Sequence, residues 1–234
     1  MCVVAIAWNA HPRWRLVVAG NRDELHSRAS APLANWNDQS GIIAGRDLVS
    51  GGSWMGVSQE GRFAVVTNIR DADGPDPDKA SRGFLVGDWL KSGELPTAGR
   101  TFNPFNLIVT DHQSARFISN RPEPTEFTLA PGVHGLSNAI PAEHWPRKER
   151  LVAQMSDWLA GLGAPPEVLL DLLAEELPPD RDAYPLFIQN PIYGTRCSTV
   201  VAVDQAGHGR ITERSFDADG AASGERSLCF DWSK

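Results

Sequence analysis

The chain has 234 residues, of which 41% are hydrophobic, and a formal net charge of −7. This length and composition provide enough apolar surface for a substantial core and predict a single domain over residues 1–234. The acidic balance argues against a nucleic-acid partner, because such partners favour a basic face. No apolar stretch approaches the roughly 20 residues that span a bilayer, so no transmembrane segment is expected.

The cysteines and histidines indicate no metal site. Cys2, Cys197 and Cys229 have no metal-ligand or redox spacing, and three cysteines do not make an even-numbered disulfide framework. The six histidines also lack ligand spacing such as an i, i+4 pair on a helix. The apolar start of the chain has no basic region of the kind that opens a signal peptide. We therefore expect a reducing, cytoplasmic setting and no cofactor.

The second residue, Cys2, carries the most chemical information. Aminopeptidases remove an initiator methionine when the next side chain is small, so the mature chain is expected to begin with Cys2. A terminal cysteine has both a nucleophile and a base, because its thiol titrates near ~8.5 and its α-amine near ~7.7–8.0. This is the N-terminal-nucleophile arrangement, in which the thiol attacks a carbonyl and the amine carries the proton.

Two strands follow from the start of the chain. The apolar, β-branched run at 2–8 is separated by turn residues 9–12 from a second run at 15–19, which predicts a hairpin. Asn21, Arg22, Asp23 and Glu24 come next, so the hairpin brings a cation and two carboxylates toward Cys2. Opposite charges nearby favour a thiolate beside Arg22 and an α-ammonium beside Asp23.

The remaining elements predict an α+β domain in which helices cover sheets. Turn residues and apolar runs indicate strands at 41–44, 53–58, 62–68, 105–111, 115–119, 126–129, 199–203 and 210–215. A short helix is expected at 84–90. Two more helices are expected to begin at Pro146 and Pro166, because proline is favoured in the first turn, and the second runs to Leu177.

Several motifs resemble one known family. The tetrapeptide Asn21 to Glu24 behind an N-terminal Met-Cys is similar to the signature of the NRDE family, also called the transport and Golgi organisation 2 family. Further matching segments are Gly52–Val57, Gly61–Asn68, Ser81–Val86, Gly135–Asn138 and Tyr193–Arg196. That family in turn resembles the Cys-type N-terminal-nucleophile hydrolases, such as bile salt hydrolases and penicillin V acylases. The resemblance implies the four-layer αββα sandwich of that class, which periodicity alone does not distinguish from other α+β layouts.

The resemblance also implies further site residues. Asn68 ends an apolar strand, and Asn138 lies in a Gly-Leu-Ser-Asn segment; both are similar in context to pocket asparagines that receive the oxyanion in bile salt hydrolases. The alternative for each is an asparagine that satisfies nearby backbone groups. Arg196 is expected either to face the site as a second cation or to be an ordinary ion-paired surface arginine.

One departure from the hydrolase pattern concerns the basic and acidic residues. In bile salt hydrolases the arginine precedes its aspartate by three residues, whereas Arg22 and Asp23 are adjacent. Adjacent side chains of a strand point to opposite faces, so both reach Cys2 only if the chain leaves regular strand geometry at Gly20 and Asn21. Asn21 shares a face with Asp23 and is a further candidate binding residue beside Cys2.

Two functions from different classes follow. The first is a hydrolase or acyltransferase for a non-peptide amide or related acyl bond, with Cys2 as nucleophile, its α-amine as acid and base, Asp23 as the group that orients the amine, and a small acyl molecule as substrate. The second is a non-catalytic carrier of haem or a lipid-type ligand on the same fold, since the resembled family is linked to haem trafficking and to lipid or acyl-CoA homeostasis. The sequence does not indicate the oligomeric state.

Overall fold

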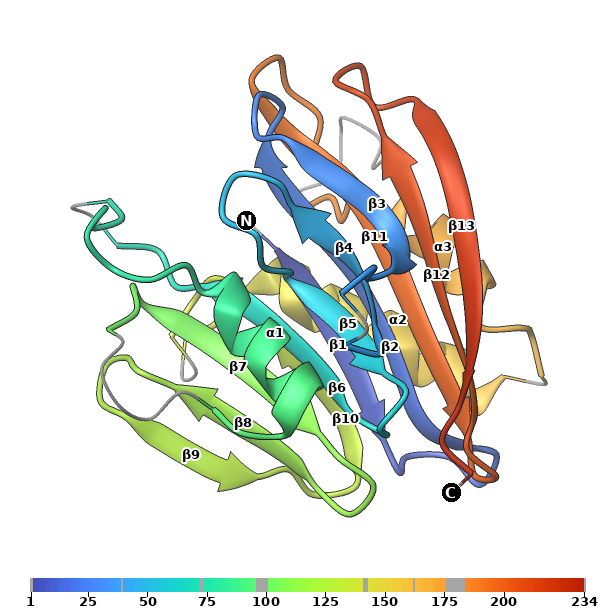
Figure 1. The fold of residues 1–234 in the computed structure, drawn as a ribbon. Helices are drawn as coiled ribbons and strands as arrows, with labels where there is room; N and C mark the ends of the chain where they lie inside the picture. Colours follow the sequence, from blue (N-terminus) through green and yellow to red (C-terminus); the bar gives the residue numbers. More distant parts are fainter. Residues whose placement is uncertain are drawn as a thin grey trace. The chain divides into compact units, whose positions relative to one another are not determined.

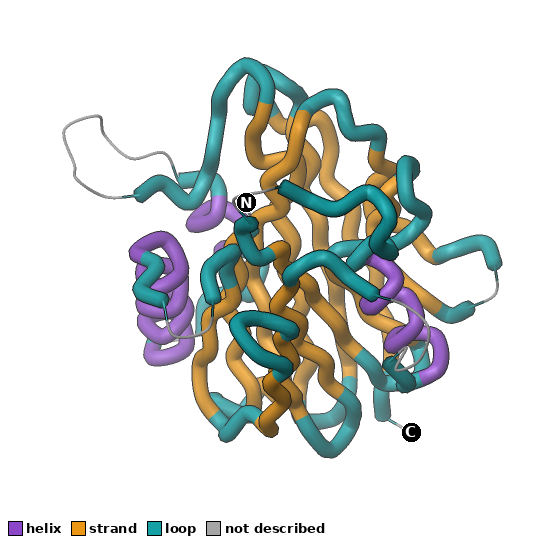
Figure 2. The backbone as a smooth tube through the Cα atoms, turned by 90° about the vertical axis from the view of Figure 1, so that its left-hand side faces the viewer, coloured by secondary structure: helices purple, strands orange, loops and turns teal. Residues whose placement is uncertain are grey.

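The computed structural model describes residues 2–38, 40–71, 74–95, 101–140, 143–161, 163–175 and 184–233. Strands account for most of the regular structure in these ranges, as Figure 2 shows. The chain divides into two compact units: Met1–Ser27, Pro131–Ser137 and His144–Lys234 form the first, and Arg28–Ala130 with Asn138–Glu143 forms the second. The single domain expected over 1–234 stays a prediction.

The first unit is built on a six-stranded antiparallel sheet (Figure 1). Its strand order is β10-β1-β2-β11-β12-β13. The strands are β1 (Val3–Trp8), β2 (Trp14–Leu25), β10 (Gly132–Leu136), β11 (Tyr193–Asp204), β12 (His208–Phe216) and β13 (Ala222–Asp231). The predicted hairpin is therefore confirmed as β1 and β2, which occupy neighbouring positions inside the sheet.

Two helices cover one face of this sheet. Helix α2 (Pro146–Ala160) begins at the predicted proline, and α3 (Val168–Leu173) is shorter than the predicted second helix, whose end at Leu177 lies outside the described residues. Alternate side chains of the central strands meet apolar side chains of both helices in one buried cluster. Its fully buried members include Val3, Ala5, Val17, Ala19, Leu151, Met155, Leu169, Leu170 and Leu173. This two-residue alternation decides which side chains face the helices.

The second unit is a seven-stranded antiparallel sheet with strands in chain order. These are β3 (Ser30–Asn35), β4 (Ile42–Asp47), β5 (Met55–Ser58), β6 (Phe63–Asn68), β7 (Phe105–Thr110), β8 (Ala115–Ser119) and β9 (Thr125–Thr128). Helix α1 (Gly83–Ser92) packs its buried side chains Leu85, Val86, Trp89 and Leu90 against β4, β6 and β7. The predicted helix at 84–90 and the predicted strands of this region agree with these elements to within a few residues at each end. None of the helices in the described ranges is long and apolar enough to cross a membrane.

Three strands are absent from the sequence-based prediction. Strands β2 and β11 are several residues longer than predicted, since β11 begins at Tyr193 rather than Thr199. Strands β3, β10 and β13 lie at sheet edges, and β13 is mostly exposed, so they lack the apolar alternation that marks inner strands. Strand β2 runs from Trp14 to Leu25 rather than ending near Ala19. The segment Asn21–Glu24 is therefore part of a regular strand and does not follow it.

The buried face of α2 generates a stability prediction. Leu151→Ala should lower the free energy of unfolding by about 2–5 kcal/mol, because it removes a fully buried side chain and leaves a cavity. Asp157→Ala, at an exposed position of the same helix, should change it by less than about 0.5 kcal/mol. Urea unfolding of both variants checks this, and equal losses would contradict the packing described for α2.

Candidate active site

Three neighbouring strands place Cys2, Arg22 and Cys197 in one row across the first sheet. Val3 pairs with Asn21 across β1 and β2, so Cys2 lies one residue further along, opposite Arg22. Arg22 pairs in turn with Cys197 of β11. Directly opposed residues of antiparallel strands share a face. The Arg22 side chain therefore lies on the same face as both thiols and between their two strands.

Cys2 as a residue is partly exposed, but the surroundings of its thiol favour the protonated form. Desolvation is the largest effect and raises the pKa of Cys2 above its usual value, and the negative charge of Asp23 raises it further. The positive chain terminus, the Arg22 guanidinium and a hydrogen bond from the Asp23 backbone N–H lower this pKa and only partly compensate. While Met1 is attached, the Cys2 thiol is therefore neutral at neutral pH. Removal of Met1 transfers the terminal positive charge to Cys2 itself.

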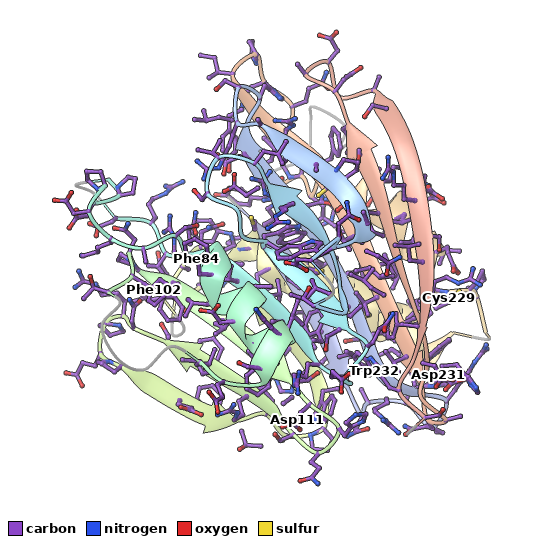
Figure 3. All side chains as sticks on the ribbon, viewed as in Figure 1. Phe84, Phe102, Asp111, Cys229, Asp231 and Trp232 are labelled. Atoms are coloured by element: carbon purple, nitrogen blue, oxygen red, sulfur yellow. The ribbon has the colours of Figure 1, made fainter. Side chains whose placement is uncertain are left out.

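The other two cysteines have different environments. Burial raises the pKa of Cys197 well above its usual value, and the Glu213 carboxylate adds to that effect, so this thiol is neutral and inert. Cys229 lies on edge strand β13 (Figure 3). It is exposed and pairs with Arg210 of β12. Because three strands separate β13 from β1, the Cys229 thiol is not part of the row that contains Cys2.

Arg22 and Glu24 form an ion pair on the Cys2 face of β2. The Arg22 Nη2 and Glu24 Oε2 atoms are 3.6 Å apart, and the two side chains are 12% and 25% exposed. Residues two apart on a strand share a face, which explains the contact. Arg22 thus provides a cation beside Cys2 without any departure of β2 from regular strand geometry.

Asp23 points to the opposite face, toward the helices. Its Oδ2 atom accepts a hydrogen bond of 2.5 Å from Nη1 of Arg147, the second residue of α2. Its Oδ1 atom accepts one of 2.7 Å from the Thr195 hydroxyl, and its backbone carbonyl accepts one of 2.7 Å from the Tyr193 hydroxyl. The sequence-based expectation that Asp23 contacts the Cys2 amine concerns the processed chain and stays a prediction.

Asn21 lies on the helix face as well, where its side chain is completely buried. Its Nδ2 group donates hydrogen bonds of 2.8 Å to the carbonyls of Leu173 and Leu186, and its Oδ1 atom accepts one of 2.6 Å from the Ser198 hydroxyl. These contacts connect β2 to the end of α3 and to β11. The Asn21 side chain is thus directed away from the face that carries the Cys2 side chain.

Arg196 occupies a β-bulge in β11. Thr195 pairs with Asp23 and Cys197 with Arg22, so Arg196 is the additional residue between two consecutive partners. Its Nη1 group donates hydrogen bonds to the backbone carbonyls of Leu25 and His26 at 3.1 and 2.9 Å. In these contacts Arg196 binds the end of β2.

The two asparagines expected at the oxyanion position belong to the second unit. Nδ2 of the buried Asn138 donates a 2.5 Å hydrogen bond to the backbone carbonyl of Asn68, whose own residue is exposed at the end of β6. Within the described residues, Oδ1 of Asn138 is buried without a hydrogen-bond partner. The structure therefore brings Asn68 and Asn138 together, and their oxyanion role stays a prediction.

Arg147, Thr195 and Tyr193 were missed by the sequence reasoning. Thr195 and Tyr193 belong to the Tyr-Gly-Thr-Arg segment, which was already noted as a motif match, so that motif carried a usable signal. Arg147 had no such signal, because it directly follows the helix-starting Pro146 and resembles an ordinary polar residue of a first turn. In the described ranges, no group of three or more His, Cys, Asp and Glu side chains is arranged to hold a metal ion.

Comparison with solved structures identifies the fold class. A Caenorhabditis elegans protein described as an N-acylethanolamine-hydrolyzing acid amidase ortholog matches with a TM-score of 0.56 at 14% identity, over 85% of this chain and 92% of that chain. At this identity the likeness shows the fold alone. The chain thus has the N-terminal-nucleophile hydrolase fold, of the αββα class that its motifs implied.

Comparison of sequences identifies the family. The profile of the family described as Transport and Golgi organisation 2 matches residues 1–218. The Transport and Golgi organization 2 homolog of Mus musculus is 30% identical over 258 residues, covering 92% of this chain and 93% of its own length. The Homo sapiens homolog is 31% identical over 262 residues with the same coverage. The chain belongs to the Transport and Golgi organisation 2 family.

The environment of Cys2 generates a prediction on its reactivity. In protein that retains Met1, alkylation of Cys2 by iodoacetamide should be slow near neutral pH, because the raised pKa keeps the thiol protonated there. The rate should still be rising above the ordinary thiol midpoint of about 8.5. Peptide mass mapping at a series of pH values measures the alkylation rate of Cys2 separately from those of Cys197 and Cys229.

A charge variant tests the contribution of Arg22 to the same measurement. Arg22→Gln should move the alkylation midpoint to higher pH, because it removes a cation that lowers the Cys2 pKa. Arg15→Gln, near the other end of β2, is the matched control and should leave the midpoint in place. If Cys2 of the parent protein showed an alkylation midpoint at lower pH than a free cysteine, the described environment would be contradicted.

Proposed function

We propose that this protein is an N-terminal-nucleophile hydrolase that uses Cys2 to cleave a non-peptide amide or a related acyl bond. The observation that carries the proposal is the position of Cys2 directly before β1, with Arg22 opposite on the same face and the Asp23 backbone N–H donating to the thiol. This combination provides a nucleophile, a cation and a hydrogen-bond donor at one end of a rigid sheet.

The proposed reaction has two steps. The sulfur of processed Cys2 attacks the carbonyl carbon while the α-amine takes the thiol proton, and the same proton passes to the leaving amine as the C–N bond breaks. A thioester on Cys2 remains. Water then attacks that thioester while the α-amine takes one of the water protons. The C–S bond breaks, the α-amine passes that proton to the sulfur, and a carboxylic acid leaves.

Arg22 favours the reactive form of the nucleophile in this scheme. Its positive charge lowers the Cys2 pKa, against the larger effect of desolvation. Asp23 is proposed to orient the α-amine, and Asn68 and Asn138 remain the expected donors to the oxyanion. The amide class of substrate is suggested by the name of the C. elegans neighbour, which describes hydrolysis of an N-acylethanolamine.

Processing of the chain is the first requirement of this mechanism. Because Cys2 is small, protein purified from cells should lack Met1 and carry a free α-amine. Intact-mass spectrometry measures the loss of methionine, and reaction with 2-cyanobenzothiazole tests for an amine and a thiol on one terminal cysteine. Complete retention of Met1, or acetylation of Cys2, would rule out the α-amine mechanism.

Acylation of Cys2 is the direct test of the enzyme assignment. Processed protein should form a covalent thioester with p-nitrophenyl acetate and release p-nitrophenolate, with a rate that rises through about pH 7–8.5 as the amine and thiol titrate. Cys2→Ala should abolish the adduct, and Cys2→Ser should slow it because the alcohol is a weaker nucleophile. The Cys229→Ser background removes the exposed competing thiol.

The carrier function is the alternative outcome of the same experiment. Protein that never acylates across a panel of amides, esters and thioesters, yet binds haem or acyl-CoA stoichiometrically, would overturn the hydrolase proposal. Ligand binding that persists in Cys2→Ala would then assign a carrier function to this protein. A shifted Soret band of bound haem in that variant would instead identify the thiol as an iron ligand.

A further inference from the structure

We propose that Arg147 is a positioning residue of this active site, which acts through Asp23 as the counter-charge and donor that keep the carboxylate correctly oriented for the Cys2 α-amine. This inference rests on the proposed function and adds to it a residue that does not itself touch the reacting atoms. Three observations within the first unit support it: a buried ion pair, a second donor on the same carboxylate, and the strand register at the start of β1.

The ion pair between Arg147 and Asp23 is almost fully enclosed. Nη1 of Arg147 lies 2.5 Å from Oδ2 of Asp23, and their side chains are 7% and 0% exposed. Nη2 of Arg147 donates a further hydrogen bond to the backbone carbonyl of Leu186. A charge in such a place is strongly disfavoured unless a partner of opposite charge is in contact with it. Arg147 therefore provides the counter-charge for a carboxylate that water barely reaches.

The other carboxylate oxygen of Asp23 is also held. Thr195 donates from its hydroxyl to Oδ1 at 2.7 Å, and its own oxygen accepts a 2.9 Å hydrogen bond from the Ile188 backbone N–H. Thr195 is thus oriented by a second contact. With Arg147 on one oxygen and Thr195 on the other, the plane of the Asp23 carboxylate is defined by donors from two different elements.

A shared hydrogen-bond acceptor connects Asn21 to the ion pair of Arg147 and Asp23. The carbonyl of Leu186 accepts hydrogen bonds from Arg147 and from Nδ2 of Asn21, which lies two residues before Asp23 on the same face of β2. The contacts therefore form one connected network from Ser198 through Asn21 and Leu186 to Arg147 and Asp23. Such a network restricts movement of β2 relative to the start of α2.

The strand register explains why this carboxylate matters for the amine. Pairing of Val3 with Asn21 places Cys2 beside Arg22, and Asp23 is the next residue of β2. Asp23 is close enough to Cys2 for its negative charge to raise the pKa of the Cys2 thiol and for its backbone N–H to donate to that thiol. Removal of Met1 makes the Cys2 nitrogen the chain end, and the inference requires that this α-amine lie within hydrogen-bonding reach of the Asp23 carboxylate.

The test follows Cys2 acylation by p-nitrophenyl acetate against pH in processed protein carrying Cys229→Ser. Arg147→Gln should reduce the rate by about tenfold or more near pH 6 and much less near pH 9, because a buried carboxylate without its cation favours the protonated form as pH falls. Arg147→Lys should restore most of the rate near pH 6, since it keeps the charge. Arg150→Gln, also on α2, removes a partly exposed ion pair with Glu175, which lies beyond the end of α3, and should match the parent profile.

The outcomes separate this inference from the proposed function. Parent protein that fails to acylate, with Cys2→Ala indistinguishable from it, overturns the proposed function and the role of Arg147 with it. Parent protein that acylates while Arg147→Gln gives a superimposable profile overturns the inference alone. A rate loss in Arg147→Gln that is equal at every pH and not relieved by Arg147→Lys also overturns it, because that pattern belongs to a structural role.

A milder variant keeps the test available if Arg147→Gln does not fold. Thr195→Val removes the donor to Oδ1 of Asp23 while preserving shape and the neighbouring charge. The acid side of its acylation profile should move in the same direction as in Arg147→Gln but by a smaller amount. An unchanged profile in folded Thr195→Val would overturn the inference.

Discussion

The two-residue alternation of strand β2 is the constraint on which the candidate site depends. Because β2 continues through Asn21–Glu24 as a regular strand, it directs Asn21 and Asp23 to the helix face and Arg22 and Glu24 to the face that carries Cys2. One tetrapeptide therefore serves two environments. A shift of one residue in register would exchange them and would put the Arg22 cation among the buried side chains beneath α2.

The helix side of this tetrapeptide is a polar network inside an otherwise apolar layer. The side chains beside it in the same layer include Val3, Leu173 and Leu186, all fully buried. Breaking a buried ion pair by removing one partner is costly, whereas replacing both partners by apolar groups often is not. The Asp23–Arg147 pair is thus weak support for stability as such. Its hydrogen bonds instead favour one arrangement of α2, β2 and β11, because Asp23 is satisfied only when Arg147 and Thr195 both reach it.

The opposite face has a different electrostatic balance. Desolvation raises the pKa of Cys2 and of Cys197, and Arg22 lowers both. The two thiols nevertheless differ in the part of the site that they occupy, because Cys2 is partly exposed at the chain end and Cys197 is buried within β11. Of these two thiols, Cys2 alone belongs to a partly exposed residue that processing would leave with a terminal amine, so it is the proposed nucleophile.

Much of the fold could be predicted from the sequence because it depends on local pattern. The apolar run at 3–8 and its returning partner specify β1 and β2, and Pro146 marks the start of α2. The edge strands β3, β10 and β13 could not be predicted in this way, since a strand with one neighbour and an exposed face needs no apolar alternation. The bulge at Arg196 had no local signal either, because it exists only in relation to the pairing of β11 with β2.

The sequence by itself determined the candidate nucleophile, the family resemblance and the cluster of charged residues behind the first hairpin, because each of these depends on residues that are neighbours in the chain. Only the tertiary structure decided where those charges point and what they contact. Asp23 and Arg147 are 124 positions apart, and Asp23 and Thr195 are 172 apart. No local pattern encodes such partners; they are selected when α2 and β11 pack against β2 and an enclosed carboxylate must find a cation and a donor.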